Sequence, residues 1–351
     1  MEKTEQRKEK SKKTRRKIFW AILAVILIAL AIALPLIYSK YYTTPRDGKP
    51  DRKSEGIVPT EEDVKNAVVY DHVVIFGVDG AGGYFSECDT PNFDRIFSEG
   101  NVNYNGLAQY PTISAENWGS MILGVTSQTH GINNNGATTI PHLGIKYPSF
   151  FKTYSKTHKK ATYFSAVDWP SINIGIIEDG IPGMRKRFGR SAAHSKDPYV
   201  VGRKIAELVA ERTKKYSDTI TFMQFDAVDH AGHAHGSGSP EYIEAIQEID
   251  KDMGIVYDAY KEKGWLENTL FICVTDHGHV KTGGHGGEDP LEKQTTLAVA
   301  GGKGNIVKGT CGKYVTHDLA PIVLYALGVQ QPSHYEGGVP KNLFTTLEKY
   351  N

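Results

Sequence analysis

An apolar run that passes directly into a polar, glycine-rich segment constrains the fold most strongly. Residues 269–274 have the composition of a short buried strand. Residues 275–287 follow at once and carry one aspartate, three histidines and five glycines. Ligands of open α/β sheets bind beyond the carboxyl ends of the strands, so this arrangement predicts a strand that leads into a site. Carboxylate and imidazole side by side suit zinc or manganese.

The chain divides into four segments by charge and hydropathy. Residues 1–17 form a basic block, and the apolar run that follows carries no charge up to Tyr38. About 20 apolar residues span a bilayer, and the basic flank favours a cytoplasmic N-terminus. We therefore expect a transmembrane anchor at 18–38, a polar linker at 39–70 and an exported domain at 71–351. A cleaved signal peptide is the alternative, but its apolar core usually has only about 7–15 residues.

Overall charge and cysteine content exclude two classes of protein. The formal net charge is +1, and most of the basic excess lies in the N-terminal block, so nucleic-acid binding is not indicated. Three cysteines cannot all pair within one chain, which argues against a disulfide-built scaffold. Cys273 lies within an apolar run and is expected to be a small buried side chain.

Strand-like and helix-like stretches alternate along the exported domain. Strands are expected at residues 72–78, 161–167, 219–225, 269–274 and 296–299. Helices are expected at residues 91–97, 148–159, 198–214, 240–263 and 316–327, with another that ends near Gly124. This alternation predicts an α/β fold with a mostly parallel central sheet and helices on both faces.

Acidic residues and histidines also follow two other expected strands. Asp79 comes after the first strand, and residues 226–236 after the third carry two aspartates and three histidines. An aspartate and a histidine four residues apart occur in two registers there, and the spacing does not choose between Asp226 with His230 and Asp229 with His233. Together with Asp276, His277 and His285, these residues supply three carboxylates and three imidazoles. That set fits two adjacent divalent cations, a recurring device of phosphoryl transfer.

A nucleophile is expected in the segment before the helix that ends near Gly124. Either Thr112 or Ser114 would place a hydroxyl at the N-terminus of that helix, where backbone N–H groups and the helix dipole favour an anion. The alternative is that one hydroxyl simply caps the helix. The residues alone do not choose between the two.

These motifs, in this order, resemble the alkaline phosphatase superfamily, specifically its type I phosphodiesterase/nucleotide pyrophosphatase family. The matching elements are the Asp79-Gly80 strand end, Pro-Thr-x-Ser114, Asp229-x-x-Gly-His233, Asp276-His277-Gly and His285-Gly. The resemblance implies that Ser114 is the nucleophile and that Asn135 contacts the phosphoryl group. It also implies two zinc ions, one held by Asp229, His233 and His285 and the other by Asp79, Asp276, His277 and Ser114.

Several positions depart from the family pattern. Serine replaces the usual threonine at the nucleophile, Leu123 stands in place of another threonine, and Ala115-Glu116 replace a common Phe-Pro pair. Substrate preference therefore does not carry over. His230, His235 and His279 have no metal role in the family, so we expect them to flank the ligands or face solvent.

The apolar run and its basic flank predict a single-pass cell-membrane protein with its large domain outside the cytoplasm, and the resemblance implies that this domain is a metal-dependent enzyme. It would hydrolyse phosphodiester or pyrophosphate bonds of nucleotide-like small molecules through a phosphoserine intermediate. The alternatives are a phosphoethanolamine- or phosphoglycerol-type transferase, a phosphomonoesterase of the same superfamily, or a binding protein that kept the fold. No arginine adjoins Ser114 and Glu116 adds a carboxylate, which favours monoanionic diesters over dianionic monoesters. Arg185 or Arg187 would change this preference by folding over the site.

Overall fold

The computed structural model describes residues 2–42, 49 and 51–351. Contacts divide the chain into two compact units, residues 1–43 and 44–351. The first unit is one helix, α1 (Glu2–Tyr42). Within the described residues, no helix combines the length and apolar character needed to cross a membrane. The predicted anchor at 18–38 is therefore not confirmed, and part of the predicted linker, residues 43–48 and 50, lies outside the described residues.

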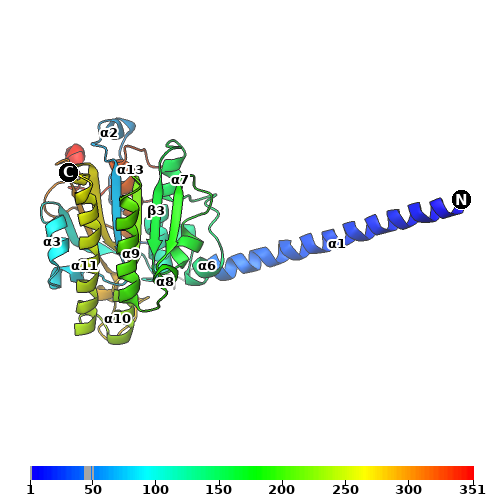
Figure 1. Cartoon of the computed structure of the whole chain (residues 1–351), viewed down its shortest axis with the longest axis horizontal. Helices are drawn as coiled ribbons and strands as arrows, with labels where there is room; N and C mark the ends of the chain where they lie inside the picture. Colours follow the sequence, from blue (N-terminus) through cyan, green and yellow to red (C-terminus); the bar gives the residue numbers. More distant parts are fainter. Residues whose placement is uncertain (1, 43–48, 50) are drawn as a thin grey trace. The chain divides into compact units, whose positions relative to one another are not determined.

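The second unit is built around one seven-stranded sheet (Figure 1). Its strands lie in the order β2-β7-β6-β1-β5-β3-β4. Neighbours from β6 through β1, β5 and β3 to β4 pair in parallel, whereas β7 pairs antiparallel with both β6 and β2. The sheet is thus mixed, and the predicted α/β class is confirmed. The strands are β1 (His72–Val78), β2 (Asn101–Leu107), β3 (Tyr163–Val167), β4 (Met184–Phe188), β5 (Ile220–Phe225), β6 (Thr269–Thr275) and β7 (Gln294–Gly301).

The second unit also contains α-helices and short helical turns. The α-helices of the second unit are α2 (Glu61–Lys65), α3 (Pro91–Phe97), α4 (Ser114–Leu123), α5 (Ser127–His130), α6 (Asn134–Thr139), α7 (Phe150–Ser155), α8 (Gly189–Ala193), α9 (Pro198–Thr213), α10 (Ala227–His235), α11 (Pro240–Glu262), α12 (Pro290–Lys293) and α13 (Leu319–Ala326). Short 3₁₀ or π turns are η1 (Tyr84–Glu87), η2 (Ile172–Ile176), η3 (Leu266–Asn268), η4 (Thr316–Asp318) and η5 (Thr345–Tyr350). The expected helix at 148–159 is thus shorter than predicted, and the expected helix at 316–327 begins as a 3₁₀ turn.

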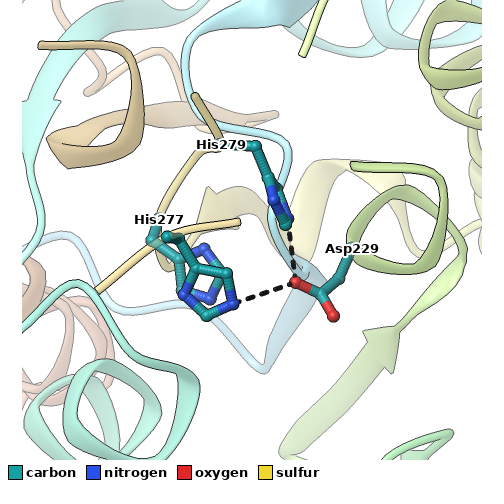
Figure 2. Close-up of side chains that lie close together, drawn as sticks. Asp229, His277 and His279 are labelled. Atoms are coloured by element: carbon teal, nitrogen blue, oxygen red, sulfur yellow. Dashed lines mark hydrogen bonds and ion pairs between the residues drawn. The ribbon is translucent and has the colours of Figure 1, made fainter. Parts of the chain in front are cut away.

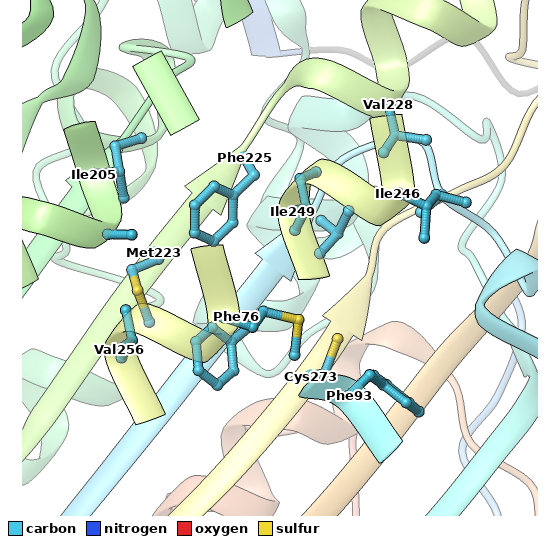
Figure 3. Close-up of a cluster of buried hydrophobic side chains, with 14 of the residues drawn as sticks. Phe76, Phe93, Ile205, Met223, Phe225, Val228, Ile246, Ile249, Val256 and Cys273 are labelled. Atoms are coloured by element: carbon cyan, nitrogen blue, oxygen red, sulfur yellow. The ribbon is translucent and has the colours of Figure 1, made fainter. Parts of the chain in front are cut away.

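Both faces of β1 are covered, as its uninterrupted apolar sequence predicts. Side chains alternate between the faces of a strand. Phe76 faces one side, in a buried cluster with residues of α3, α9 and α11 that also takes in Cys273 (Figure 3). On the other side α4 lies so close that a β-carbon at Gly77 would be 2.6 Å from the Trp118 ring. Helices on both faces are therefore confirmed.

The strand register brings three loops to one edge of the sheet. Val78, the last residue of β1, pairs with Phe225 of β5 and with Thr275 of β6. The next residue along each of these strands is an aspartate, Asp79, Asp226 or Asp276. Three aspartates therefore lie side by side at the carboxyl ends of the central strands.

Part of the expected linker, residues 57–63, packs on the rest of the second unit. The backbone of Ile57 pairs with that of Val339, and the Tyr350 hydroxyl donates to Asp63. Asp63 also closes a capping box with Thr60 at the start of α2. These residues are therefore part of the folded second unit.

Candidate functional site

Asp79, Asp276 and His277 form a buried group at the carboxyl edge of β1 and β6. All three side chains are nearly or fully buried. His277 Nε2 lies 3.5 Å from Asp79 Oδ1, 3.3 Å from Asp276 Oδ2 and 3.2 Å from the Ser114 hydroxyl. Zinc bonds of about 2.0–2.1 Å give a tetrahedron whose corners are about 3.3–3.4 Å apart. The spacing of these four atoms therefore fits a single tetrahedral ion.

Asp229, His233 and His285 form a second group beside the first. Helix α10 places Asp229 and His233 one turn apart, with 3.5 Å between Asp229 Oδ2 and His233 Nε2. His285 Nε2 lies 3.2 Å from His233 Nε2 and 3.6 Å from Asp229 Oδ1. The His285 Nδ1 atom lies 2.6 Å from the Thr112 carbonyl, which only accepts, so Nδ1 carries the proton and Nε2 is left to ligate. These three side chains therefore surround a position for one metal ion, and ligand atoms of His277 and His279 also lie within 4.8 Å of those of Asp229 and His285.

The structure separates the two registers that the sequence left open. Asp226 accepts from Arg190 (3.0 Å) and lies 3.2 Å from His230 Nε2, whereas Asp229 and His233 face His285. Arg190, which α8 contributes and which the sequence did not single out, also donates to Asp168 at 2.7 Å. Asp226 is therefore committed to a polar cluster beside the two groups.

Each carboxylate of the two groups has one oxygen held by a donor of the chain. Asp79 Oδ2 accepts from Trp118 Nε1 at 2.8 Å and from Gln224 Nε2 at 3.0 Å. Asp276 Oδ1 accepts from two backbone N–H groups, and its Oδ2 is buried with no hydrogen-bond partner among the described residues. Buried polar atoms almost always have a hydrogen-bond partner. The unpaired Asp276 Oδ2, which faces His277, is therefore available to bind a metal ion.

The electrostatics of the site also favour bound cations. Burial, followed by the charges of Asp276 and Asp229, raises the pKa of Asp79 well above its usual range. Burial and the Asp229 charge likewise raise the pKa of Asp276. Burial, reinforced by the nearby His285, lowers the pKa of His277, so its ring is neutral. Carboxylates so close together ionise readily only with a cation between them, and neutral imidazoles are the form that binds it.

Ser114 and Thr112 have different surroundings, which separates the two candidate nucleophiles. Ser114 is the first residue of α4, and its hydroxyl belongs to the first ligand group. Thr112 is fully buried; its hydroxyl accepts from Gly286 N at 2.9 Å and lies 3.3 Å from Glu292 Oε2. Thr112 therefore holds the loop that carries His285, and Ser114 is the hydroxyl at the site.

The remaining predicted residues lie at the margin. Asn135 is exposed on α6, and its neighbour Asn134 accepts from the Ala115 N–H at 3.0 Å, so the role of Asn135 stays a prediction. His230 and His235 are about half exposed, but His279 is fully buried beside Asp229 (Figure 2). Glu116 is buried as well, and burial raises its pKa to about 8.

A mixed α/β sheet whose central strands end in two groups of aspartate and histidine defines an α/β protein equipped to hold metal ions. The family model described as type I phosphodiesterase/nucleotide pyrophosphatase matches residues 73–308. The chain therefore belongs to that family, as the motif order predicted.

Individual relatives are distant. The chain is 23% identical over 228 residues to ectonucleotide pyrophosphatase/phosphodiesterase family member 3 of Bos taurus, covering 60% of this chain and 25% of that protein. It is 37% identical over 75 residues to GPI ethanolamine phosphate transferase 2 of Aspergillus fumigatus, covering 21% of this chain and 10% of that protein. The chain thus spans about a quarter or less of these curated relatives.

Solved structures share the fold. Murine ectonucleotide pyrophosphatase/phosphodiesterase 5 superposes with a TM-score of 0.57 at 13% identity, covering 74% of this chain and 96% of that one. The lipoteichoic acid synthase LtaP from Listeria monocytogenes gives a TM-score of 0.57 at 14% identity, covering 81% of each chain. At such identities the likeness concerns the fold alone.

Proposed function

We propose that the chain is a two-zinc phosphodiesterase or pyrophosphatase that forms a phosphoserine intermediate. The observation that carries this proposal is the position of the Ser114 hydroxyl, 3.2 Å from His277 Nε2 and 3.5 Å from Asp79 Oδ1. A hydroxyl enclosed by imidazole and carboxylate is arranged as a metal-activated nucleophile rather than as a helix cap, and no side-chain capping bond is present at α4.

The residues divide into two ligand sets. Asp229, His233 and His285 would hold one ion, and Asp79, Asp276, His277 and Ser114 the other. Divalent ions bound there lower the pKa of a coordinated hydroxyl and neutralise charge on the phosphoryl oxygens.

The chain's own groups orient the reaction. Ser114 points its hydroxyl toward Asp79 Oδ1 from the N-terminal end of α4, where the helix dipole favours the phosphate anion. Ser114 Oγ forms the new bond to phosphorus as the bond to the leaving oxygen breaks, and water later cleaves the phosphoserine. Asn135 is proposed to hold a non-bridging oxygen. Because Asp79, Asp276 and His277 are already buried and hydrogen-bonded, little reorganisation of these three side chains accompanies the charge shift.

Diesters are the proposed substrate class. Arg190 borders the site but is paired with Asp168 and Asp226, so its charge is already compensated rather than offered to a dianionic monoester. Repulsion by Glu116 is a weaker reason than the sequence implied, since a carboxyl with a pKa of about 8 is mostly protonated at neutral pH. The family description supports the same class, and a murine structural neighbour solved in complex with AMP supports a nucleotide-like ligand.

The test is a comparison of substrates on the zinc-loaded chain at one pH. We expect higher kcat/KM for a nitrophenyl nucleotide diester than for nitrophenyl phosphate, and no turnover of either by Ser114→Ala. A clear preference for the monoester would overturn the diesterase proposal, and full activity in excess chelator would overturn the metal site.

Transfer to an acceptor alcohol is the second candidate. The GPI ethanolamine phosphate transferase relatives and the fold likeness to a lipoteichoic acid synthase favour it. The phosphoserine would then be resolved by an alcohol in place of water. A transferred product formed faster than free phosphate ester in the presence of glycerol or a glycolipid would favour this alternative.

The location of the catalytic unit is a proposal that rests on sequence. The basic block before the apolar run at 18–38 supports a membrane anchor with residues beyond it outside the cytoplasm. Protease treatment of intact cells tests this, because a chain protected from external protease would contradict it.

A further inference from the structure

His279 is a buried histidine that the ligand sets leave unused. It has no exposed surface, and its ring centre lies 4.9 Å from that of His233 and 4.9 Å from that of His285. Figure 2 shows the ring pointing at the Asp229 carboxylate. The residue therefore lies against the second ligand group and away from solvent.

The contact with Asp229 fixes which nitrogen of His279 carries a proton. His279 Nε2 is 2.9 Å from Asp229 Oδ1, and since a carboxylate only accepts, Nε2 is the donor. A protonated nitrogen has no lone pair for a metal ion, and Nδ1 is buried with no hydrogen-bond partner among the described residues. The bond leaves Asp229 Oδ1 facing His285 and Oδ2 facing His233, the two other members of the group.

Two glycines from other strand ends make room for this ring. A β-carbon at Gly232 would lie 2.4 Å from His279 Cδ2, and one at Gly80 would lie 2.9 Å from His279 Nε2. Gly232 is inside α10, where glycine is less favourable than alanine by about 1 kcal/mol. The space for His279 is therefore provided by two segments that are distant from it in the sequence.

We infer that His279 is a positioning residue: its Nε2–H fixes the rotation of the Asp229 carboxylate so that the carboxylate, His233 and His285 present a preformed metal site. The inference rests on the proposed two-metal function and concerns one of its two sites. Groups that hydrogen-bond a ligating side chain typically change metal affinity by about 10–100-fold when removed. We expect that effect at the Asp229 site and little at the Asp79 site.

Zinc titration of the full chain, followed by calorimetry, tests the role. His279→Leu replaces the ring with an apolar side chain of similar size that has no donor, and should weaken one of two zinc sites by about 10–100-fold. His279→Gln keeps an N–H donor at a similar reach, and should bind zinc within about threefold of the unmodified chain. His235→Leu changes a half-exposed histidine of the same region and serves as the control.

Gly232→Ala supplies an independent test that leaves His279 in the sequence. The added methyl group would displace the ring, so zinc affinity should fall in the unmodified background but not in a His279→Ala background. Thermal melting of the metal-free chains shows whether His279→Leu folds. If it does not, the comparison of Gly232→Ala in the two backgrounds still tests the role of His279.

Two results would overturn the inference while leaving the proposed function intact. One is zinc binding by His279→Leu as tight as that of the unmodified chain. The other is a loss in His279→Gln equal to that in His279→Leu, which would make the ring nitrogen a ligand. Failure of the unmodified chain to bind zinc would instead refute the proposed function itself.

Discussion

Substituting Ser114 and Thr112 separately distinguishes the proposed nucleophile from a residue that stabilises the loop beside it. Ser114→Ala removes the atom that is proposed to form the bond to phosphorus, and we expect kcat/KM to fall by at least about 10⁴-fold. Thr112→Val keeps the shape of the side chain but leaves the Gly286 N–H and a Glu292 oxygen without one partner each. Leaving a buried polar group unpaired costs about 1–3 kcal/mol.

The Thr112 carbonyl, which holds His285, belongs to the backbone and survives the substitution. Thr112→Val should therefore lower the free energy of unfolding by about 1–3 kcal/mol and reduce kcat/KM by no more than about 10²-fold. Urea unfolding and diester hydrolysis at fixed zinc concentration measure the two quantities. An inactive, folded Thr112→Val beside an active Ser114→Ala would refute the assignment of the nucleophile.

Two further predictions concern a carboxylate support and a buried imidazole. Trp118→Phe removes one of the two side-chain donors to Asp79 Oδ2 and should weaken zinc binding about tenfold with the fold intact; unchanged titration curves would contradict this. Burial lowers the pKa of His317 from 6.5 to about 4, so its neutral ring contributes stability that is fully present above pH 6.5 and lost as the pH falls toward 4. The lowered pKa corresponds to about 3 kcal/mol of free energy of unfolding, and His317→Gln should remove this pH dependence. Unfolding of the zinc-free chains at pH 7 and pH 4.5 measures it. If both chains lost the same free energy of unfolding between the two pH values, His317 would not be responsible.

The central part of the fold was predictable because it depends on local signals. β1, β5 and β6 are continuous apolar runs, and the aspartates that follow them share one edge through the pairing of Val78 with Phe225 and Thr275. The edge strands β2 and β4 were missed, since their sequences are polar or basic. Charged residues are common on edge strands because they hinder pairing with other chains. Helix α10 was also missed, as its histidines and glycine do not show an apolar face.

What the sequence left open at the site depends on contacts between distant segments. The choice between the registers of Asp226 and Asp229 follows from Arg190, which lies 36 residues before Asp226 and binds it. The burial of His279 likewise depends on space at Gly80 and Gly232, which spacing alone does not reveal. The register of Asp229 and His233 came from the family resemblance and stays a prediction for metal binding, although the structure brings both residues together with His285.

The distance between Ser114, the proposed nucleophile, and Asp79 is set by helix packing rather than by a loop. Ser114 and Trp118 are four residues apart on α4 and so lie on the same side of the helix. The Trp118 ring packs against β1 at Gly77, where no β-carbon holds it away, and its Nε1–H reaches Asp79 just beyond the end of that strand. One turn back along the same helix, the Ser114 hydroxyl meets the other oxygen of Asp79. A side chain at Gly77 would therefore shift α4 as a whole and move the proposed nucleophile together with the donor that holds Asp79, which is why we regard Gly77, Trp118 and Ser114 as one unit of the site.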